Sequence, residues 1–170
     1  NKILQYNKNM NKNNPQIYLF TDGSVHPQSG IGFGGYLFLD ELELTSKLED
    51  KIQTKQFNNT SSTKLELETL LWALHEIDSK NSKIIIYTDC QNIIGLNDRR
   101  ERFEKNDYMT GKGNLIKNHE LYKAFYKLID ILDCEFIKVK GHKKTSTKNE
   151  IDDIFTLVDK ATRNALRKNI

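Results

Sequence analysis

The stretch that decides the fold is Ile17-Tyr-Leu-Phe-Thr-Asp22-Gly-Ser24, a short apolar run that ends at an aspartate and a turn. The uninterrupted apolar residues 17–20 predict a buried strand. A carboxylate beside a core costs desolvation energy unless a cation compensates it. Asp22 is therefore a candidate metal ligand, although an aspartate before Gly-Ser also commonly caps a turn.

Three further acids stand in comparable places. Asp89 ends the apolar run at 84–87, Glu66 lies in the first turn of an amphipathic stretch, and Asp159 follows Phe155 by one helical turn. Four carboxylates at core-facing ends predict a metal site, and all-oxygen ligands favour Mg²⁺ or Mn²⁺ over Zn²⁺. Taken singly, Asp89 is equally a helix cap, and Asp159 equally the partner of a nearby Lys or Arg.

Glu66 has two interpretations. The sequence Thr63-Lys-Leu-Glu66 fits a capping box, in which the glutamate bonds back to the helix start. However, Glu66 shares a helical stripe with Leu70, Ala73 and Ile77, which marks the inner side of the helix. That stripe makes Glu66 a better ligand candidate than Glu68.

The rest of the chain predicts one domain that contains both strands and helices. The alternation of Leu42 and Leu44 with glutamates indicates a half-exposed strand, and the charged stretch 97–118 a protruding segment with little core of its own. We expect strands at 17–20, 35–39, 52–57, 84–88 and 136–139, and helices after the cap at 61–63, at 91–96, from 121 to 132 and from 151 to 165. The apolar strand 84–88 should be buried on both faces.

Composition narrows the class of protein. At 170 residues and 37% hydrophobic, the chain fits one domain, expected at 17–170, after a polar leader at 1–16 that is rich in Asn and Lys. No segment is apolar enough for a secretory signal or a membrane span, which predicts a soluble, cytoplasmic protein. Cys90 and Cys134 are expected to be reduced thiols at the edge of the core.

The net charge of +3 is mild, but its distribution is uneven. Basic residues gather at Arg99, Arg100, Arg102 and Lys105, in the lysine-rich stretch 138–148, and near the C-terminus. Such clusters on a near-neutral domain suit a polyanion bound on one face, although each alone is as readily an ordinary solvated surface.

Taken together, the acidic motifs resemble those of type 1 ribonuclease H. The segments that carry the resemblance, in the family's order, are Thr21-Asp-Gly-Ser with Gly34-Gly-Tyr, Leu65-Glu-Leu, Tyr87-Thr-Asp-Cys-Gln91, Val139-Lys-Gly-His142 and Val158-Asp-Lys-Ala. The resemblance runs from about residue 17 to the end of the chain. It implies an α/β, ribonuclease H-like fold: a mixed five-stranded sheet, made of an antiparallel meander plus parallel strands, flanked by helices.

The resemblance also implies an activity, namely endonucleolytic cleavage of the RNA strand of an RNA/DNA hybrid by two Mg²⁺ or Mn²⁺ ions, leaving 3′-hydroxyl and 5′-phosphate ends. Asp22 would lie between the ions, with Glu66, Asp89 and Asp159 completing the ligands. His142, whose reference pKa is near neutral, would shuttle a proton or help the product leave. The residues expected to contact substrate are Gly23, Ser24, Ser62, Thr63, Gln91, Asn118, Arg99, Arg100 and Arg102. A monomer with no obligatory protein partner and no membrane contact is expected.

The chain departs from the family pattern in three places. The stretch between His142 and Asp159 is longer than usual, and Asn149-Glu-Ile-Asp-Asp153 within it also mimics the last acidic motif. The fourth ligand is therefore Asp159, which the Val-Asp-Lys-Ala match favours, or else Asp152 or Asp153. Ser62 and Thr63 stand where the family has an Asn pair.

The third departure is a protrusion that lacks the family's tryptophans and carries Phe103, Tyr108 and Tyr122 among charged residues. Two rival classes remain: a 3′-5′ exonuclease of the same fold and an inactive hybrid-binding module. The exonucleases typically carry Asp-x-Glu on the first strand, where this chain has Asp22-Gly-Ser. An inactive module is expected to have lost an acid, and none is missing.

Overall fold

A computed structural model describes residues 15–79, 81–140 and 149–170. Its centre is a five-stranded sheet in the order β3-β2-β1-β4-β5. The strands are β1 (Gln16–His26), β2 (Ile31–Leu39), β3 (Gln53–Phe57), β4 (Lys83–Thr88) and β5 (Asp133–Lys138). The first three strands form an antiparallel meander, while β4 runs parallel to β1 and to β5. The predicted mixed sheet is confirmed.

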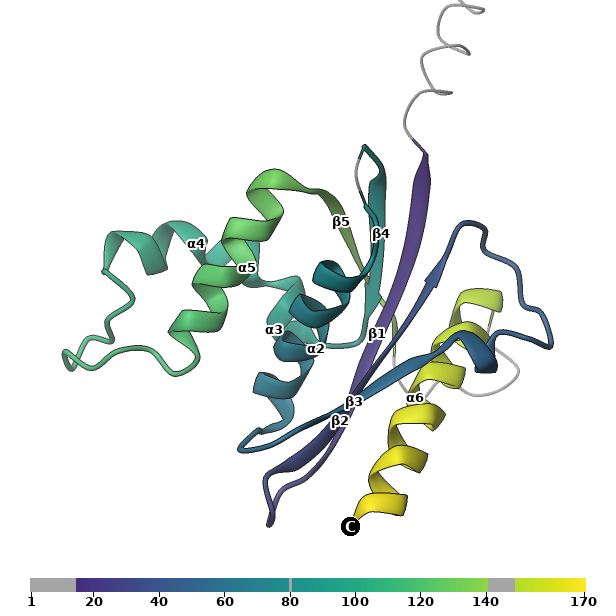
Figure 1. Ribbon diagram of the computed structural model, residues 1–170. Coiled ribbons are helices and arrows are strands. Elements are labelled where there is room, and N and C mark those ends of the chain that lie inside the picture. Colours follow the sequence, from purple (N-terminus) through teal and green to yellow (C-terminus); the bar gives the residue numbers. More distant parts are fainter. Residues whose placement is uncertain (1–14, 80, 141–148) are drawn as a thin grey trace, which may run out of the picture.

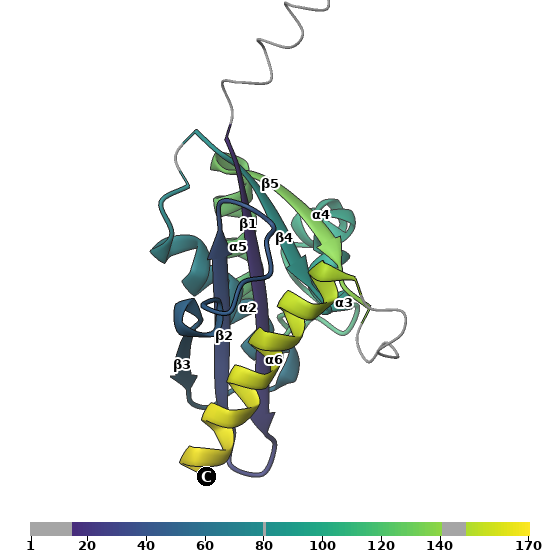
Figure 2. The same cartoon turned by 90° about the vertical axis from the view of Figure 1, so that its right-hand side faces the viewer.

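Helices cover both faces of the sheet (Figure 1). They are α2 (Ser62–Glu76), α3 (Gln91–Ile94), α4 (Leu96–Lys105), α5 (His119–Ile131) and α6 (Glu150–Asn169). Helices α2 and α5 lie on one side, and α6 crosses β1 and β2 on the other (Figure 2). The site described below depends on this sandwich, because it brings α2 and α6 to opposite faces of one strand.

The core has two parts, one on each face of the sheet. In β4, Ile84 and Ile86 belong to the α2–α5 side, and Ile85 and Tyr87 to the α6 side. All four are nearly inaccessible. The prediction that 84–88 is buried on both faces is therefore confirmed, and its lack of alternation follows from having a core on each side.

The first hairpin is longer than the sequence predicted. β1 runs through Asp22 to His26, beyond the strand expected at 17–20, and β2 begins at Ile31, before the strand expected at 35–39. The glycines are needed for close packing: a Cβ on Gly34 would lie 2.0 Å from Thr69 Oγ1 of α2, and one on Gly35 would lie 2.7 Å from Thr162 Cγ2 of α6. Both helices therefore approach the β2 backbone closely.

The half-exposed strand predicted around Leu42 and Leu44 is wrong. Residues 40–52 form an irregular connection that contains only a short 3₁₀ helix, η1 (Glu49–Lys51). These residues join no strand of the described sheet, and β3 pairs with β2 only between Gln53 and Phe57. Instead, the Leu44 N–H donates to Glu150 Oε1 of α6 at 2.7 Å.

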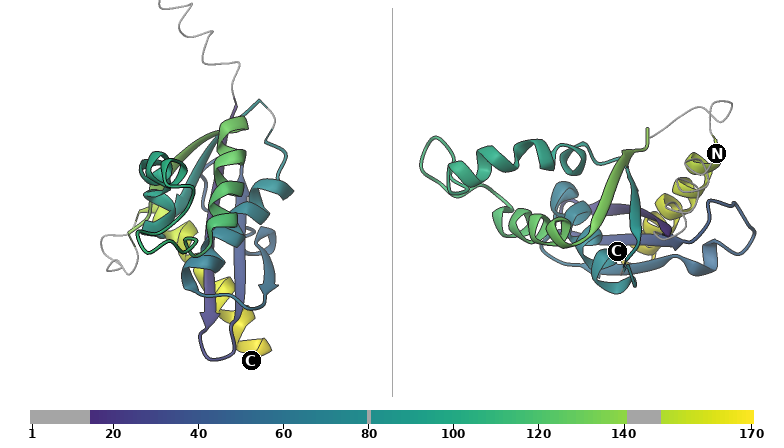
Figure 3. Two further views of the ribbon diagram at one scale, coloured as in Figure 1. Left: turned by 90° about the vertical axis from the view of Figure 1, so that its left-hand side faces the viewer. Right: turned by 90° about the horizontal axis from the view of Figure 1, so that it is seen from above.

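The charged segment 97–118 protrudes as expected (Figure 3), but it contributes more to the core than the sequence indicated. It contains most of α4, and Phe103 and Tyr108 are both buried. The Phe103 ring stacks on Tyr122 of α5, with centroids 5.4 Å apart and planes 9° apart. The aromatic residues of this segment therefore join α4 to α5.

The leader predicted at 1–16 falls almost entirely outside the described residues. The described chain begins at Pro15, whose carbonyl accepts a hydrogen bond from Lys83 N, and β1 starts one residue later. Among the helices of the described ranges, none has the length and apolar character needed to cross a membrane.

Candidate active site

Three elements bring Asp22, Glu66 and Asp89 together. Asp22 lies within β1, and Asp89 directly follows the parallel strand β4, whose Tyr87 pairs with Phe20. Glu66 lies near the start of α2, which packs across β1 and β2. One carboxylate oxygen from each of the three acids lies within 4.8 Å of the other two. Parallel strands place equivalent residues at one level of a sheet, which explains the meeting of Asp22 and Asp89.

The acids line a hollow of about 340 Å³, which we call the acidic hollow. It is bounded by Asp22, Gly23, Ser62, Thr63, Glu66, Asp89, Cys90 and Asp159. Asp22 and Glu66 are only 5% and 8% exposed, and Asp89 is more open. Two buried acids beside a more exposed one suit a site in which the protein binds a cation on one side and the other side stays open to solvent.

The electrostatics of the acidic hollow are those of crowded carboxylates. Burial first, and then the charge of Asp89, raise the pKa of Asp22 to about 8. Burial, followed by Asp22 and Asp89, also raises the pKa of Glu66 well above its ordinary value. Without a cation, burial and crowding therefore favour the protonated forms of these groups.

Glu66 carries a further sign of a missing partner. Its Oε2 atom is buried and has no hydrogen-bond partner among the described residues. A buried acceptor left without a donor is costly, and a hard divalent cation would satisfy it. The donor set therefore fits Mg²⁺ or Mn²⁺: carboxylate oxygens meet in a small space, and one of them is unsatisfied.

The capping interpretation of Glu66 is wrong. Helix α2 begins after Ser61, so Thr63 is already inside the helix and is not its cap. The Ser61 side chain makes no capping hydrogen bond. Glu66 instead faces inward, as its stripe with Leu70 and Ala73 indicated.

The fourth acid of the acidic hollow is Asp159. It hydrogen-bonds with Asp22 and adds to the rise in that residue's pKa. On the other side, Asp159 forms an ion pair with Arg163, one turn later on α6. A side-chain hydrogen bond also joins α6 to β1 nearby, because Ser24 Oγ and Thr162 Oγ1 lie 3.1 Å apart.

Asp152 and Asp153 lie elsewhere. Asp152 is the capping-box residue of α6: its carboxylate accepts from Asn149 N at 3.1 Å, and its own N–H donates to Asn149 Oδ1 at 3.0 Å. Neither acid lines the acidic hollow. The second acidic motif in the sequence is thus a helix start, two turns before Asp159. That Asp159 is a metal ligand remains a prediction.

The predicted substrate residues are scattered. Gly23, Ser62 and Thr63 line the acidic hollow, and both hydroxyl side chains are exposed. Gln91 is exposed at the start of α3, where Lys138 Nζ donates to its Oε1 at 2.5 Å. Asn118 adopts a left-handed conformation before α5 and does not line the acidic hollow.

The three arginines of α4 differ in their surroundings. Arg99 donates to the Gly95 carbonyl and to both oxygens of Asn92, which holds α4 against α3. Arg100 forms a forked pair with Asp130 of α5 and also binds Glu104. Arg102 is exposed and lies over the Phe103 ring. A role in substrate binding stays a prediction for all three. Arg99 and Arg100 have polar partners in these contacts within the described residues, whereas the contact of Arg102 is with an aromatic ring.

His142 lies outside the described residues, so its predicted role has no structural counterpart here. In contrast, Cys90 belongs to the acidic hollow, where the sequence suggested only a thiol at the core edge. Its position directly after Asp89 was the available signal. Thr162 and Arg163, which contact Asp159, were also missed, because their roles follow from its location on α6.

The sheet order and the cluster of acids together define an enzyme of the ribonuclease H-like class. The ribonuclease H family model matches residues 14–163, so the chain belongs to the ribonuclease H family. This family uses divalent metal ions and binds RNA/DNA hybrids.

Relatives named ribonuclease H agree with this assignment. The one from Clostridium botulinum is 28% identical over 145 residues, covering 82% of this chain and 92% of that protein. The one from Orientia tsutsugamushi is 27% identical over 158 residues, covering 92% and 89%. Among solved structures, a foamy viral protease-reverse transcriptase in complex with double-stranded DNA matches with a TM-score of 0.56. It has 13% identity and covers 83% of this chain and 90% of that one, and this shows the fold alone.

Proposed function

We propose that this chain is an endoribonuclease that cleaves the RNA strand of RNA/DNA hybrids with two divalent ions, Mg²⁺ or Mn²⁺, and leaves 3′-hydroxyl and 5′-phosphate ends. The observation that carries the proposal is the meeting of Asp22, Glu66 and Asp89 within 4.8 Å in a chain of this family. With Asp159 the acidic hollow has four carboxylates, which offer enough oxygen atoms for two hard cations.

Each acid has a part in this proposal. Asp22, which lies beside the other acids, would help to hold both cations, and Glu66, Asp89 and Asp159 would supply further carboxylate oxygens. When bound, the cations would activate water, neutralise the scissile phosphate and stabilise the leaving 3′ oxygen. The raised pKa values of Asp22 and Glu66 mean that cation binding must displace protons from the acidic hollow.

Discrimination between RNA and DNA would lie at the start of α2. The exposed hydroxyls of Ser62 and Thr63 line the acidic hollow beside Glu66, where they can hydrogen-bond a sugar. A 2′-hydroxyl is both a donor and an acceptor, and it is the group that distinguishes the two nucleic acids. His142 would assist proton transfer or product release. The enzyme is proposed to act as a monomer.

The test is a substrate panel. A uniformly labelled RNA/DNA hybrid, duplex RNA, duplex DNA and single strands are each incubated with and without Mg²⁺. We expect internal cleavage of the RNA in the hybrid only, dependent on the metal, with 5′-phosphate products. Stepwise shortening from the 3′ end would instead support the exonuclease alternative, and binding without cleavage would support the inactive module.

A further inference from the structure

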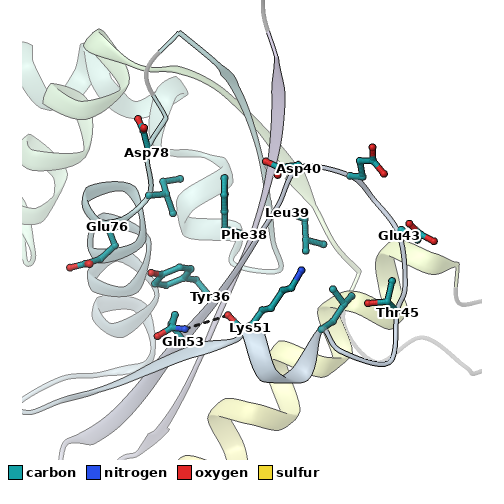
Figure 4. Close-up of a pocket in the computed structure, with 13 residues that line it drawn as sticks. Tyr36, Phe38, Leu39, Asp40, Glu43, Thr45, Lys51, Gln53, Glu76 and Asp78 are labelled. Atoms are coloured by element: carbon teal, nitrogen blue, oxygen red, sulfur yellow. Dashed lines mark hydrogen bonds between the residues drawn. The ribbon is translucent and has the colours of Figure 1, made fainter.

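A second hollow lies between the end of β2, the connection 40–52 and the C-terminal end of α2 (Figure 4). Its volume is about 840 Å³, and it shares no residue with the acidic hollow. We call it the β2-edge hollow. Tyr36, Phe38 and Leu39 of β2 form one wall, with Lys51 and Gln53 opposite and Glu76 at the α2 end. Nothing in the proposed cleavage reaction uses it.

The wall formed by β2 is an open strand edge. β2 pairs with β3 only as far as Tyr36, whereas its pairing with β1 continues through Leu37 and Phe38 to Leu39. Within the described chain, the last three residues of β2 therefore have a neighbouring strand on one side alone. Since a strand directs its backbone N–H and C=O groups to both edges, unpaired groups face the β2-edge hollow. Such an edge is a template for another strand.

The rim of the β2-edge hollow is strongly acidic. It carries Asp40, Glu41, Glu43, Glu76 and Asp78 against the single base Lys51. Among the described ion pairs, none involves Asp40, Glu41, Glu43 or Glu76. Because the whole chain has a net charge of +3, this is a local reversal of sign. It repels nucleic acid and attracts a basic partner.

Tyr36 adds a polar group to the wall of the β2-edge hollow. Its side chain is only 9% exposed, and its ring packs edge-on against Trp72 at 4.8 Å. Its side chain lies in the β2-edge hollow beside Glu76 (Figure 4). The hydroxyl can donate a hydrogen bond to a carbonyl of a peptide that enters the hollow.

We propose that the β2-edge hollow binds an extended peptide segment of a partner protein, with Lys or Arg at alternate positions, which adds as a strand to residues 37–39 of β2. Alternate side chains of an added strand point to opposite faces of the sheet. Basic side chains on the α2 face would meet Glu76 and Asp78. Apolar ones on the α6 face would pack on Leu39 and Leu48, which belong to the core on that side.

The experiment is a titration of the ¹⁵N-labelled full chain, with saturating Mg²⁺ to neutralise the acidic hollow. The probe is the capped peptide Lys-Val-Lys-Val-Lys-Val-Lys. We expect saturable shifts of the amide signals of residues 36–40, and slower hydrogen exchange at one or more of residues 37–39. Glu76→Lys and Glu43→Lys should each weaken binding at least about fivefold, as expected for reversing a charge near the ligand. The matched control Glu101→Lys reverses an exposed acid on α4 and should leave binding unchanged.

Four outcomes would overturn the proposal. Equal binding of the peptide with Glu in place of Lys would remove the charge argument. Equal binding of spermine, or of a peptide interrupted by proline, would show a cation site without strand addition. Shifts confined to other parts of the sheet would exclude this edge. Finally, tighter binding of a peptide copying residues 1–14 would make the chain's own N-terminal segment the occupant in place of a partner.

Discussion

Ser24 of β1 donates its hydroxyl proton to Thr162 of α6, because Thr162 itself donates to the carbonyl oxygen of Asp159 at 2.9 Å. This chain of two hydrogen bonds connects the strand that carries Asp22 to the helix that carries Asp159. It fixes which turn of α6 faces the acidic hollow. A helix displaced by two turns would present Asp152 instead.

Asp22→Asn should abolish hydrolysis of the hybrid and leave the fold intact. The change removes the carboxylate that is central to the acid cluster, so both cations would lose a ligand. Without metal, the variant should be more stable than the parent by about 1 kcal/mol, since the amide avoids the cost of either burying a charge or taking up a proton at this position. Turnover and thermal unfolding without metal are the measurements. Near-parental turnover would contradict the two-ion proposal.

The stability of the metal-free chain should fall as pH rises from about 4 to 8. The pKa of Asp22 is raised to about 8 in the folded chain, and the pKa of Glu66 is raised as well. The folded state therefore binds more protons than the unfolded state over this window, and stability is lost as they dissociate. Thermal unfolding with a chelator at several pH values measures the slope. Asp22→Asn or saturating Mg²⁺ should reduce it, and an unchanged slope in both cases would contradict the assignment.

Asp159→Asn and Asp152→Asn should have different effects. Asp159 lines the acidic hollow, so its amide variant should lose at least about a hundredfold in turnover, as is typical when a catalytic electrostatic group is removed. Asp152 caps α6, so its variant should keep activity and lose about 1 kcal/mol of stability. Asp153→Asn is the matched control for both. The reverse order of activities would place the metal site at the start of α6.

Substitutions of the α4 arginines should have different effects, some on protein stability and others on substrate binding. Arg102→Gln should raise the Michaelis constant and lower the salt dependence of binding by about one unit of slope, because one phosphate contact is lost. Arg100→Gln should instead cost about 1 kcal/mol of stability, since its fork to Asp130 joins α4 to α5. Binding isotherms at several salt concentrations and urea unfolding give the two readouts. A loss of turnover at saturating hybrid with unchanged affinity would show that Arg102 does not bind substrate.

Gly34→Ala should be strongly destabilising. The added methyl group would lie 2.0 Å from Thr69 Oγ1, so α2 would have to move away from β2 and carry Glu66 with it. We expect a loss of at least about 2 kcal/mol, in the range of core overpacking. Gly111→Ala is the control, because its Cβ would meet nothing within 4 Å. Urea unfolding compares the two, and equal midpoints would show that the helix is not held this closely.

The sequence by itself determined the strands that carry Asp22 and Asp89. A run such as 84–88, apolar at every position, has few stable places other than the centre of a sheet between two cores. The helical stripe through Glu66 likewise marked an inward side chain, because its spacing with Leu70 and Ala73 is set by the helix geometry alone. The local hydrophobic pattern was sufficient to predict these elements because the period of each segment fixes which side chains face the core.

Tertiary structure alone decided the matters that depend on a neighbour. The alternation of Leu42 and Leu44 was consistent with a strand, but residues 40–52 leave the sheet, and β3 pairs with β2 only from Gln53 onward. Helical period could not tell whether Asp152 or Asp159 lies at the acidic hollow, because both lie on one stripe, two turns apart. The structure places Asp159 at the acidic hollow, because α6 packs along β1 with Thr162 hydrogen-bonded to Ser24. Contacts between distant segments fix such positions, and a one-dimensional pattern does not contain them.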